Sequence, residues 1–191
     1  MREIILASAS PRRQELMARL GLACTVDPAA TGEDTGDGEK PEEIVQAISR
    51  AKALAVAGRH PGALIIAADT IGLFRGHILG KPRDAADARR MLGMLSDRSH
   101  LVITGFTLMD AASGKTLTRA VTTRVYLRRL TRQEIDGYVK TGEPMDKAGA
   151  YAIQGQGALL VEKISGDYYN VMGLPLCALG EALGDFGINL L

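Results

Sequence analysis

The sequence predicts an α/β fold with a mixed sheet, because apolar runs typical of buried strands alternate with segments of helical periodicity. Four segments have the apolar or alternating pattern of strands: 4–7, 63–68, 101–109 and 116–127. Residues 41–57 and 84–95 instead place apolar side chains on one face of a helix. Because the last two strands are long and joined by a short turn, we expect an antiparallel hairpin and βα units in the same sheet.

Capping and breaker residues set the ends of the other elements in the first half of the chain. The first helix begins at Ser10-Pro11, since serine is a favoured N-cap and proline a favoured first helical residue, and Gly21 ends it. A short strand follows at 24–26. The polar stretch 31–40 contains three glycines, and we interpret it as a loop and not as a linker between domains.

In the second half of the chain, residues 71–79 have the pattern of a hairpin that turns at Arg75-Gly76. Thr131 is expected to cap a helix. We expect a strand over 151–164, around two glycines, and a final helix that starts at 174–175 and ends near Gly187.

Length and composition favour one domain, or two small halves of one fold, in a chain of 191 residues. A net charge of +1 and an aromatic content of 4% argue against nucleic-acid binding through bulk charge or base stacking. The chain starts without the pattern of a signal peptide and contains no run of 18 apolar residues, so no membrane span is expected. Cys24 and Cys177 lie far apart and lack metal-ligand spacing, which favours a reducing cytoplasm.

Arg12 and Arg13 are unusual because they lie in the first turn of the first helix. Positive charge there opposes the helix dipole by about 0.3–1 kcal/mol for each exposed side chain. An anion bound at the helix N-terminus would remove the conflict, since free N–H groups and guanidinium groups both suit a phosphate. The alternative is that both arginines are solvated.

Lys52 and Asp69 are charged residues in apolar surroundings. On a helical projection that starts at Ile44, Lys52 falls within the apolar arc, so its side chain either extends to solvent or meets a buried anion. Asp69 ends a wholly apolar strand, and ligands of α/β sheets tend to collect outside the carboxyl ends of strands. Asp69 is therefore a candidate general base or metal ligand, with a turn or a helix cap as the alternative.

Two further polar side chains lie next to a proline or a glycine, residues that set the local backbone conformation. Lys81 precedes a proline, and taken alone it indicates an ordinary turn. Gln154 lies among glycines, where a close approach to a ligand and a plain bulge are both consistent with the pattern. Together, the basic groups and carboxylates suit a polyphosphate bound with a hard divalent cation. The residues concerned are Arg12, Arg13, Lys52, Lys81, Asp69 and either Glu33 or Asp34.

At these residues the chain resembles the Maf family of nucleoside triphosphate pyrophosphatases, from Leu6 to about Leu183. The resemblance is carried by short motifs that occur in the family's order: 8–16, 52–53, 68–70, 80–82, 146–151, 153–155 and 170–176. Each motif is weak by itself, but the shared order is highly specific.

The resemblance implies an elongated mixed α/β fold similar to the inosine triphosphate pyrophosphatases, with two lobes of one domain (1–191) around a central cleft. It also implies a homodimer. The reaction it implies is hydrolysis between the α- and β-phosphates of a nucleoside triphosphate, which gives the monophosphate and pyrophosphate with Mg²⁺ or Mn²⁺ as cofactor.

Site residues are carried over by position. Asp69 matches the proton acceptor and a metal ligand, and Glu33 matches a second acidic ligand, a role that Asp34 would fill as the alternative. Three residues match positions that select the base: Arg12, Thr70 and Gln154. Four residues match positions that contact phosphates: Ser8, Arg13, Lys52 and Lys81.

The pair Asp69-Thr70, together with Gln154, resembles the branch that acts on dTTP and UTP. The branch that acts on 7-methyl-GTP carries glutamine in place of this threonine. A preference for 7-methyl-GTP is one alternative, and a nucleotide-binding regulator of cell division or septum formation with little catalysis is the other. The presence of Asp69 beside basic residues argues against the second.

Overall fold

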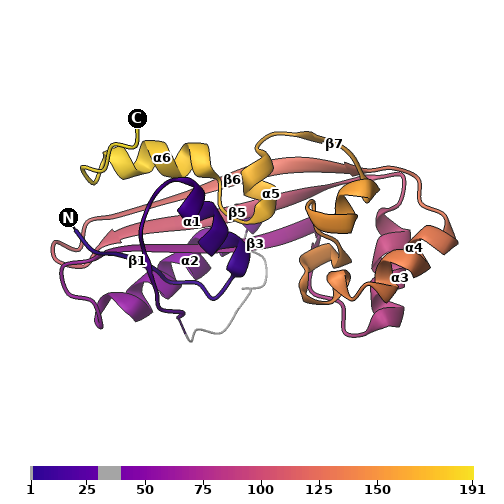
Figure 1. The fold of residues 1–191 in the computed structure, drawn as a ribbon, viewed down its shortest axis with the longest axis horizontal. Coiled ribbons are helices and arrows are strands. Elements are labelled where there is room, and N and C mark those ends of the chain that lie inside the picture. Colours follow the sequence, from indigo (N-terminus) through magenta and orange to yellow (C-terminus); the bar gives the residue numbers. More distant parts are fainter. Residues whose placement is uncertain (1, 30–39) are drawn as a thin grey trace. The chain divides into compact units, whose positions relative to one another are not determined.

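The computed structural model describes residues 2–29 and 40–191, and it shows a mixed sheet with helices (Figure 1). The strands are β1 (Ile4–Leu6), β2 (Thr25–Val26), β3 (Leu64–Phe74), β4 (His77–Leu79), β5 (Ser99–Asp110), β6 (Thr116–Leu127) and β7 (Val161–Ser165). The α-helices are α1 (Pro11–Arg19), α2 (Pro41–Ala57), α3 (Ala85–Leu95), α4 (Arg132–Lys140), α5 (Tyr168–Met172) and α6 (Leu176–Gly184). Three 3₁₀ helices complete the described elements: η1 (Glu143–Asp146), η2 (Ala148–Ala150) and η3 (Gly155–Leu160).

The sheet contains both parallel and antiparallel pairs, as predicted. Its hydrogen-bonded order is β2-β1-β3-β5-β6-β7, and β4 pairs with β3. Ile5 of β1 lies opposite Thr25 and Ile65 in two parallel pairs. Leu73 lies opposite Ile78 in the antiparallel hairpin that turns at the expected position. The predicted α/β class is therefore confirmed.

The chain divides into two compact units. The first unit comprises Met1–Thr70, Ile103–Val121 and Gly173–Leu191, and the second comprises Ile71–Val102 and Thr122–Met172. Each is described by itself below.

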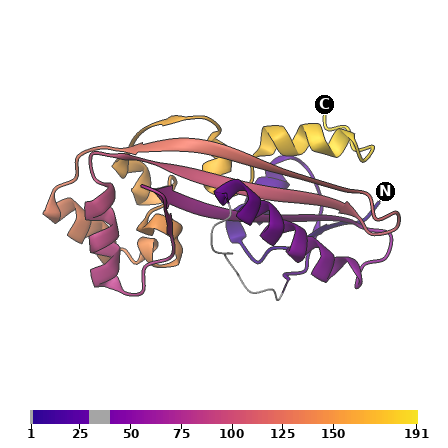
Figure 2. The same ribbon diagram turned by 180° about the vertical axis from the view of Figure 1, so that it is seen from behind.

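In the first unit, α1 and α6 lie on one side of the strands and α2 lies on the other (Figures 1 and 2). The core beneath α2 includes Ala53, Val56 and Ile65, all fully buried. A Cβ on Gly105 of β5 would lie only 2.4 Å from the backbone carbonyl of Val45, so glycine allows α2 to approach the sheet this closely. This contact helps to hold α2, which carries Lys52.

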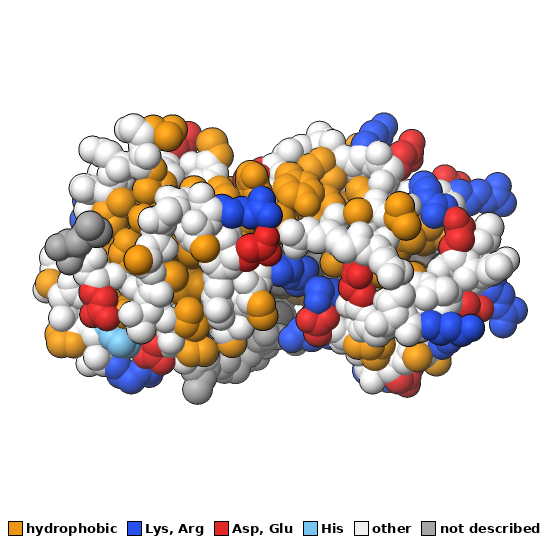
Figure 3. All heavy atoms as spheres, viewed as in Figure 1, with side chains coloured by type: hydrophobic (Ala, Val, Ile, Leu, Met, Phe, Trp, Pro, Cys, Tyr) orange, Lys and Arg blue, Asp and Glu red, His pale blue; other side chains and the backbone are white. Residues whose placement is uncertain are grey.

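In the second unit, α3 and α4 pack together around a core that includes Leu92, Val125 and Tyr138. Thr131 caps α4 as expected, and it forms a capping box with Glu134. Elsewhere the unit carries surface ion pairs such as that between Arg89 and Asp136, at 2.6 Å. Basic and acidic side chains are interspersed on the face of the molecule drawn in Figure 3.

Two predictions of secondary structure need correction. β3 does not end at Asp69 but continues to Phe74. The strand expected over 151–164 is wrong before Val161, because η3 occupies Gly155–Leu160. The physical reason is that Gly155 has a positive φ of 63° and the next two amides bond to a glutamate and not to a strand. Within the described residues, no helix is long and apolar enough to cross a membrane.

Candidate active site

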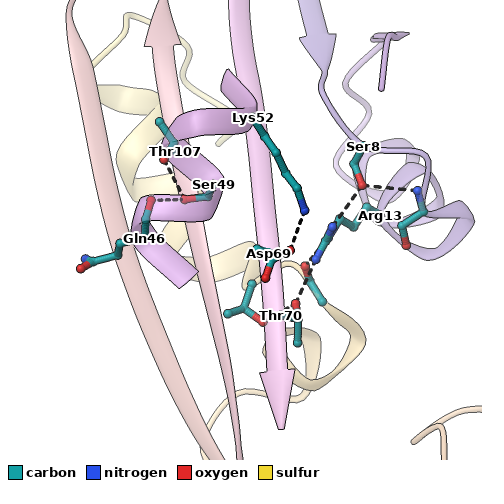
Figure 4. A network of polar contacts seen from close by, with 11 residues as sticks. Ser8, Arg13, Gln46, Ser49, Lys52, Asp69, Thr70 and Thr107 are labelled. Carbon is teal, nitrogen blue, oxygen red and sulfur yellow. Dashed lines mark hydrogen bonds and ion pairs between the residues drawn. The ribbon is translucent and has the colours of Figure 1, made fainter. Parts of the chain in front are cut away.

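Lys52 and Asp69 form an ion pair between α2 and β3 in the first unit (Figure 4). The Nζ of Lys52 donates to Oδ1 of Asp69 at 2.6 Å. The two side chains are 13% and 10% exposed. Of the two interpretations of Lys52, the structure supports the buried anion, because a carboxylate lies where the lysine enters the apolar side of its helix.

Asp69 retains an unused acceptor. Its Oδ2 accepts no hydrogen bond from any described residue, whereas Oδ1 is held by Lys52. A carboxylate has roughly four acceptor positions, so this group has capacity for a water, a metal ion or a proton. The expectation that Asp69 ends its strand is wrong, because β3 continues to Phe74. What distinguishes the surroundings of Asp69 is its ion pair with Lys52.

Arg13 connects three segments of the first unit. Its Nε donates to the carbonyl of Gly173 at 2.8 Å, its Nη1 to Ser8 Oγ at 3.1 Å and its Nη2 to Thr70 Oγ1 at 3.0 Å. Figure 4 shows the guanidinium group pointing at Ser8 and Thr70. Arg13 thus joins the start of α1 to β3 and to the chain before α6.

Thr104 is a member of this network that sequence reasoning missed. Its Oγ1 lies 2.9 Å from Oγ1 of Thr70, within hydrogen-bonding distance. The residue is fully buried in β5. A threonine in a strand is ordinary by composition, so no sequence signal separates Thr104 from the other threonines of that strand. Gly173 was missed as a partner of Arg13 for a similar reason. The acceptor is its backbone carbonyl, which every residue has, so the residue type gives no signal.

A second buried polar chain anchors α2 to the sheet. Ser49 Oγ lies 2.9 Å from Thr107 Oγ1 and donates to the carbonyl of Gln46 at 2.9 Å (Figure 4). Thr107 Oγ1 in turn lies 3.0 Å from Thr118 Oγ1. Because Ser49 is one helical turn before Lys52, these contacts fix the part of α2 from which the lysine extends.

The N-terminus of α1 is suited to an anion. Ser10 is the N-cap, but its side chain makes no capping hydrogen bond, and the first turn contains no acidic residue. Arg12 is half-buried and forms no hydrogen bond or ion pair with the part of the chain that the structure describes. Both features fit the prediction that a phosphate or another polar ligand group binds near this helix end.

Lys81 and Gln154 belong to the second unit, and their predicted roles stay predictions. Lys81 is exposed and lines a pocket of about 590 Å³, and the neighbouring carbonyl of Gly80 accepts a hydrogen bond from Gly149 N at 3.1 Å. Gln154 is half-buried, and its side chain has no hydrogen-bond partner among the described residues.

Two of the three arginines that line this pocket, Arg83 and Arg90, are bonded to one acid. Asp87 accepts from Arg83 Nε at 3.4 Å and lies 2.7 Å from Arg90 Nη2. The hydrogen bond from Arg90 is the main cause that lowers the pKa of Asp87. Among these cations Lys81 has no acidic partner in the described structure, which leaves its ammonium group available.

The donor set for a divalent cation is partly described. No group of three or more histidine, cysteine, aspartate or glutamate side chains within 2–29 and 40–191 is arranged to hold a metal ion. Glu33 and Asp34 lie outside the described residues. Asp69 fits one ligand position, since Mg²⁺ is often bound by one or two carboxylates together with substrate phosphates.

One of the solved structures that match is similar over part of the chain. A HAM1 protein from Coxiella burnetii aligns over 68% of this chain and 75% of its own at 21% identity, with a TM-score of 0.47.

Relatives with similar sequences cover the whole chain. A protein of Moorella thermoacetica named dTTP/UTP pyrophosphatase is 48% identical over 190 residues, which are 100% of this chain and 98% of the relative. Proteins of the same name from Geotalea uraniireducens and Methanosarcina barkeri are 50% and 46% identical and cover 96% and 100% of this chain, and 95% and 97% of their own lengths. The family model described as Maf-like protein matches residues 3–186, so the chain belongs to the Maf family.

Proposed function

We propose that this protein is a nucleoside triphosphate pyrophosphatase that hydrolyses dTTP and UTP to the nucleoside monophosphate and pyrophosphate. The observation that supports it most directly is the buried Lys52–Asp69 pair, in which Asp69 Oδ2 remains open to a reactant. Relatives that are 46–50% identical across nearly the whole chain bear the name of this activity.

In the proposed reaction, Asp69 accepts a proton from the attacking water. The water oxygen forms a bond to the α-phosphorus, the bond between that phosphorus and the α–β bridging oxygen breaks, and pyrophosphate leaves. Lys52 holds the carboxylate through Oδ1, so that Oδ2 is the oxygen directed to the water. A positioned base of this kind contributes about 10²–10⁴ in rate.

Mg²⁺ or Mn²⁺ is the proposed cofactor, held by Asp69, by Glu33 and by the phosphates of the substrate. Such a cation neutralises phosphate charge and stabilises the leaving pyrophosphate.

The substrate contacts are divided between phosphates and base. Arg13, Lys52, Lys81 and Ser8 are proposed to bind phosphates, with the N-terminus of α1 as an additional donor. Arg12, Thr70 and Gln154 are proposed to select the base. Thr70 Oγ1 is bonded to Arg13 and Thr104, so the threonine that distinguishes the two branches of the family has a fixed orientation.

A substrate panel tests the function. Purified protein is incubated with Mg²⁺ or Mn²⁺ and with dTTP, UTP, CTP, ATP or 7-methyl-GTP, and the products are separated by chromatography. We expect thymidine or uridine monophosphate together with pyrophosphate. Diphosphate plus phosphate would contradict attack at the α-phosphorus. Preferred cleavage of 7-methyl-GTP would assign the chain to the other branch, and tight binding without turnover would favour the regulator of cell division.

We further propose a homodimer located in the cytoplasm. The two cysteines are free thiols in the structure, as a reducing compartment requires. The oligomeric state is measured by light scattering on the purified protein, where a monomer mass would contradict the proposal.

A further inference from the structure

Two glycines shape the segment of the second unit that carries Gln154. Gly155 has a φ of 63°, in the left-handed region that glycine favours, and a Cβ there would lie 2.7 Å from Oε2 of Glu143. A Cβ on Gly157 would lie 2.2 Å from the carbonyl oxygen of Ala152. The segment from Ala152 to Gly157 therefore folds back on itself and against Glu143 more closely than any larger residue allows.

The Glu143 carboxylate binds this segment through the backbone. Its Oε2 accepts a hydrogen bond from the amide of Gln156 at 3.1 Å, and its Oε1 accepts one from the amide of Gly157 at 3.1 Å. Hydrogen bonds from backbone N–H groups to a carboxylate are charge-assisted and stronger than neutral ones. Glu143 thus acts as an internal anion for two successive amides on the C-terminal side of Gln154.

Tyr138 holds the other side of the segment. Its hydroxyl donates to Oε1 of Glu143 at 2.9 Å and accepts from the amide of Ala152 at 3.1 Å. Tyr138 lies on α4 and is only 5% exposed, because its ring packs in the hydrophobic core of the second unit. This packing fixes the position of its hydroxyl group. Glu143 and Tyr138 together bond the backbone on both sides of Gln154.

The Gln154 side chain is left for another partner. It makes no hydrogen bond with the described residues, and it precedes η3 without capping it. The backbone that carries this amide is already fixed, so only the side-chain rotamers of Gln154 remain to be ordered when the amide binds.

We propose that Glu143 is a positioning residue for substrate selection, whose carboxylate holds segment 152–157 so that the Gln154 amide is aimed at the base of the nucleotide. This rests on the proposed function, in which Gln154 helps to select the pyrimidine. Glu143 itself touches no substrate.

Glu143→Gln is the central test, because it keeps the shape of the side chain but replaces one acceptor oxygen with an NH₂ group that faces N–H donors. We expect kcat to stay within about twofold and KM for dTTP and UTP to rise about five- to tenfold, the factor that one hydrogen bond is typically worth. The preference for dTTP over ATP in kcat/KM falls by the same factor. The matched control is Glu162→Gln, an exposed glutamate on β7 that should leave both quantities unchanged.

A double substitution shows whether the effect passes through Gln154. In a Gln154→Ala background, Glu143→Gln should change the preference for dTTP no further. A further loss of preference there, or an equal loss of activity toward every triphosphate, would overturn the proposal. If Glu143→Gln fails to fold, Tyr138→Phe provides the second variant, with a shift in the same direction of about threefold.

Amide hydrogen exchange supplies a readout that needs no substrate. We expect the amides of Gln156 and Gly157 to exchange at least about tenfold faster in Glu143→Gln than in the wild type, since they lose a charge-assisted bond. Unchanged exchange refutes positioning by Glu143 whatever the substrate is. Absence of dTTP and UTP hydrolysis by the wild type instead refutes the proposed function, and with it the selection role, even where the exchange becomes faster.

Discussion

Asp69 in the first unit is buried and Glu143 in the second is half-buried, and the two carboxylates also differ in the groups that bind them. Asp69 has one hydrogen-bond partner among the described residues, Lys52, and its Oδ2 is unused. Glu143 accepts three hydrogen bonds, from a tyrosine hydroxyl and two backbone amides, so both of its oxygens are engaged.

Because of this difference, the Asp69 carboxylate is available to react, whereas the Glu143 carboxylate holds the backbone around it in place. A carboxylate with a vacant acceptor position can take a proton or a cation at that atom. A carboxylate bonded by several donors cannot do so without losing bonds, and its removal disturbs the backbone it holds.

Asp69→Asn should lower kcat by about 10²–10⁴ because the amide cannot accept the proton of the attacking water. The unfolding temperature should fall but the protein should stay folded, since the amide oxygen still accepts a hydrogen bond from Lys52 although the ammonium group loses its counter-charge. Steady-state kinetics with dTTP and a thermal melt of the same preparation measure both. Near-normal turnover would remove Asp69 from the reaction, and loss of the fold would place it with Glu143 as a structural carboxylate.

The stability of the second unit should depend on His100. Its ring is buried beside the Tyr151 hydroxyl, with Nε2 at 2.8 Å, and burial lowers the pKa of His100 to about 4. An unfolded histidine has a pKa of about 6.5, so between these values the unfolded chain binds a proton that the folded chain does not.

The free energy of unfolding should therefore fall as pH is lowered from about 6.5 to about 4, and the contribution levels off below that. The loss is on the order of 3 kcal/mol, at about 1.4 kcal/mol for each unit of pKa. Urea denaturation at several pH values compares the wild type with His100→Gln, which lacks this titration. Parallel pH profiles for the two proteins would contradict this prediction. They would show that the titration of His100 adds nothing to the pH dependence of the free energy of unfolding.

Lys52→Met should leave the Asp69 carboxylate without its cation and destabilise the protein by about 1–3 kcal/mol. The cost should shrink in an Asp69→Asn background, where there is no charge to leave unpaired. A double-mutant cycle on the free energy of unfolding measures this coupling. If the effects of the two substitutions on the free energy of unfolding are simply additive, the coupling energy between Lys52 and Asp69 is zero. The ion pair then adds no stability to the contact between α2 and β3.

Arg13→Lys should cost about 1–2 kcal/mol of stability, because an ammonium group cannot reach the three acceptors that the guanidinium group bonds. The matched control is Arg12→Lys in the same helical turn, which has no partner in the described structure and should leave stability unchanged. Thermal melts of both variants decide the matter. Equal effects would mean that the three hydrogen bonds of Arg13 add no net stability to the fold.

Local signals in the sequence identified most of the elements. Pro41 and the acidic residues after it predict the start of α2, and the apolar run before Asp69 predicts most of the buried part of β3. The prediction over 151–164 failed where two glycines and Glu143 override the strand pattern. Apolar alternation reports burial, but it does not report which acceptor receives a backbone N–H.

The candidate site shows the same division. The position of Lys52 in the apolar arc indicated a buried anion or an extended side chain, and only the structure identified Asp69, 17 residues away, as the partner. The motif around Arg13 suggested an anion, whereas the structure shows hydrogen bonds that reach as far as Gly173, 160 residues along the chain. Nothing in the periodicity of the sequence pointed to Thr104 or Glu143.

Residue patterns and motifs predicted the α/β class, the helix starts at proline and threonine, the family, and a set of basic and acidic residues suited to a polyphosphate. The tertiary structure alone decided which of these residues meet, which oxygen of Asp69 stays open and which carboxylate holds the segment of Gln154. The physical reason is range: capping and periodicity act within a few residues, whereas ion pairs and hydrogen bonds between side chains depend on how distant segments pack.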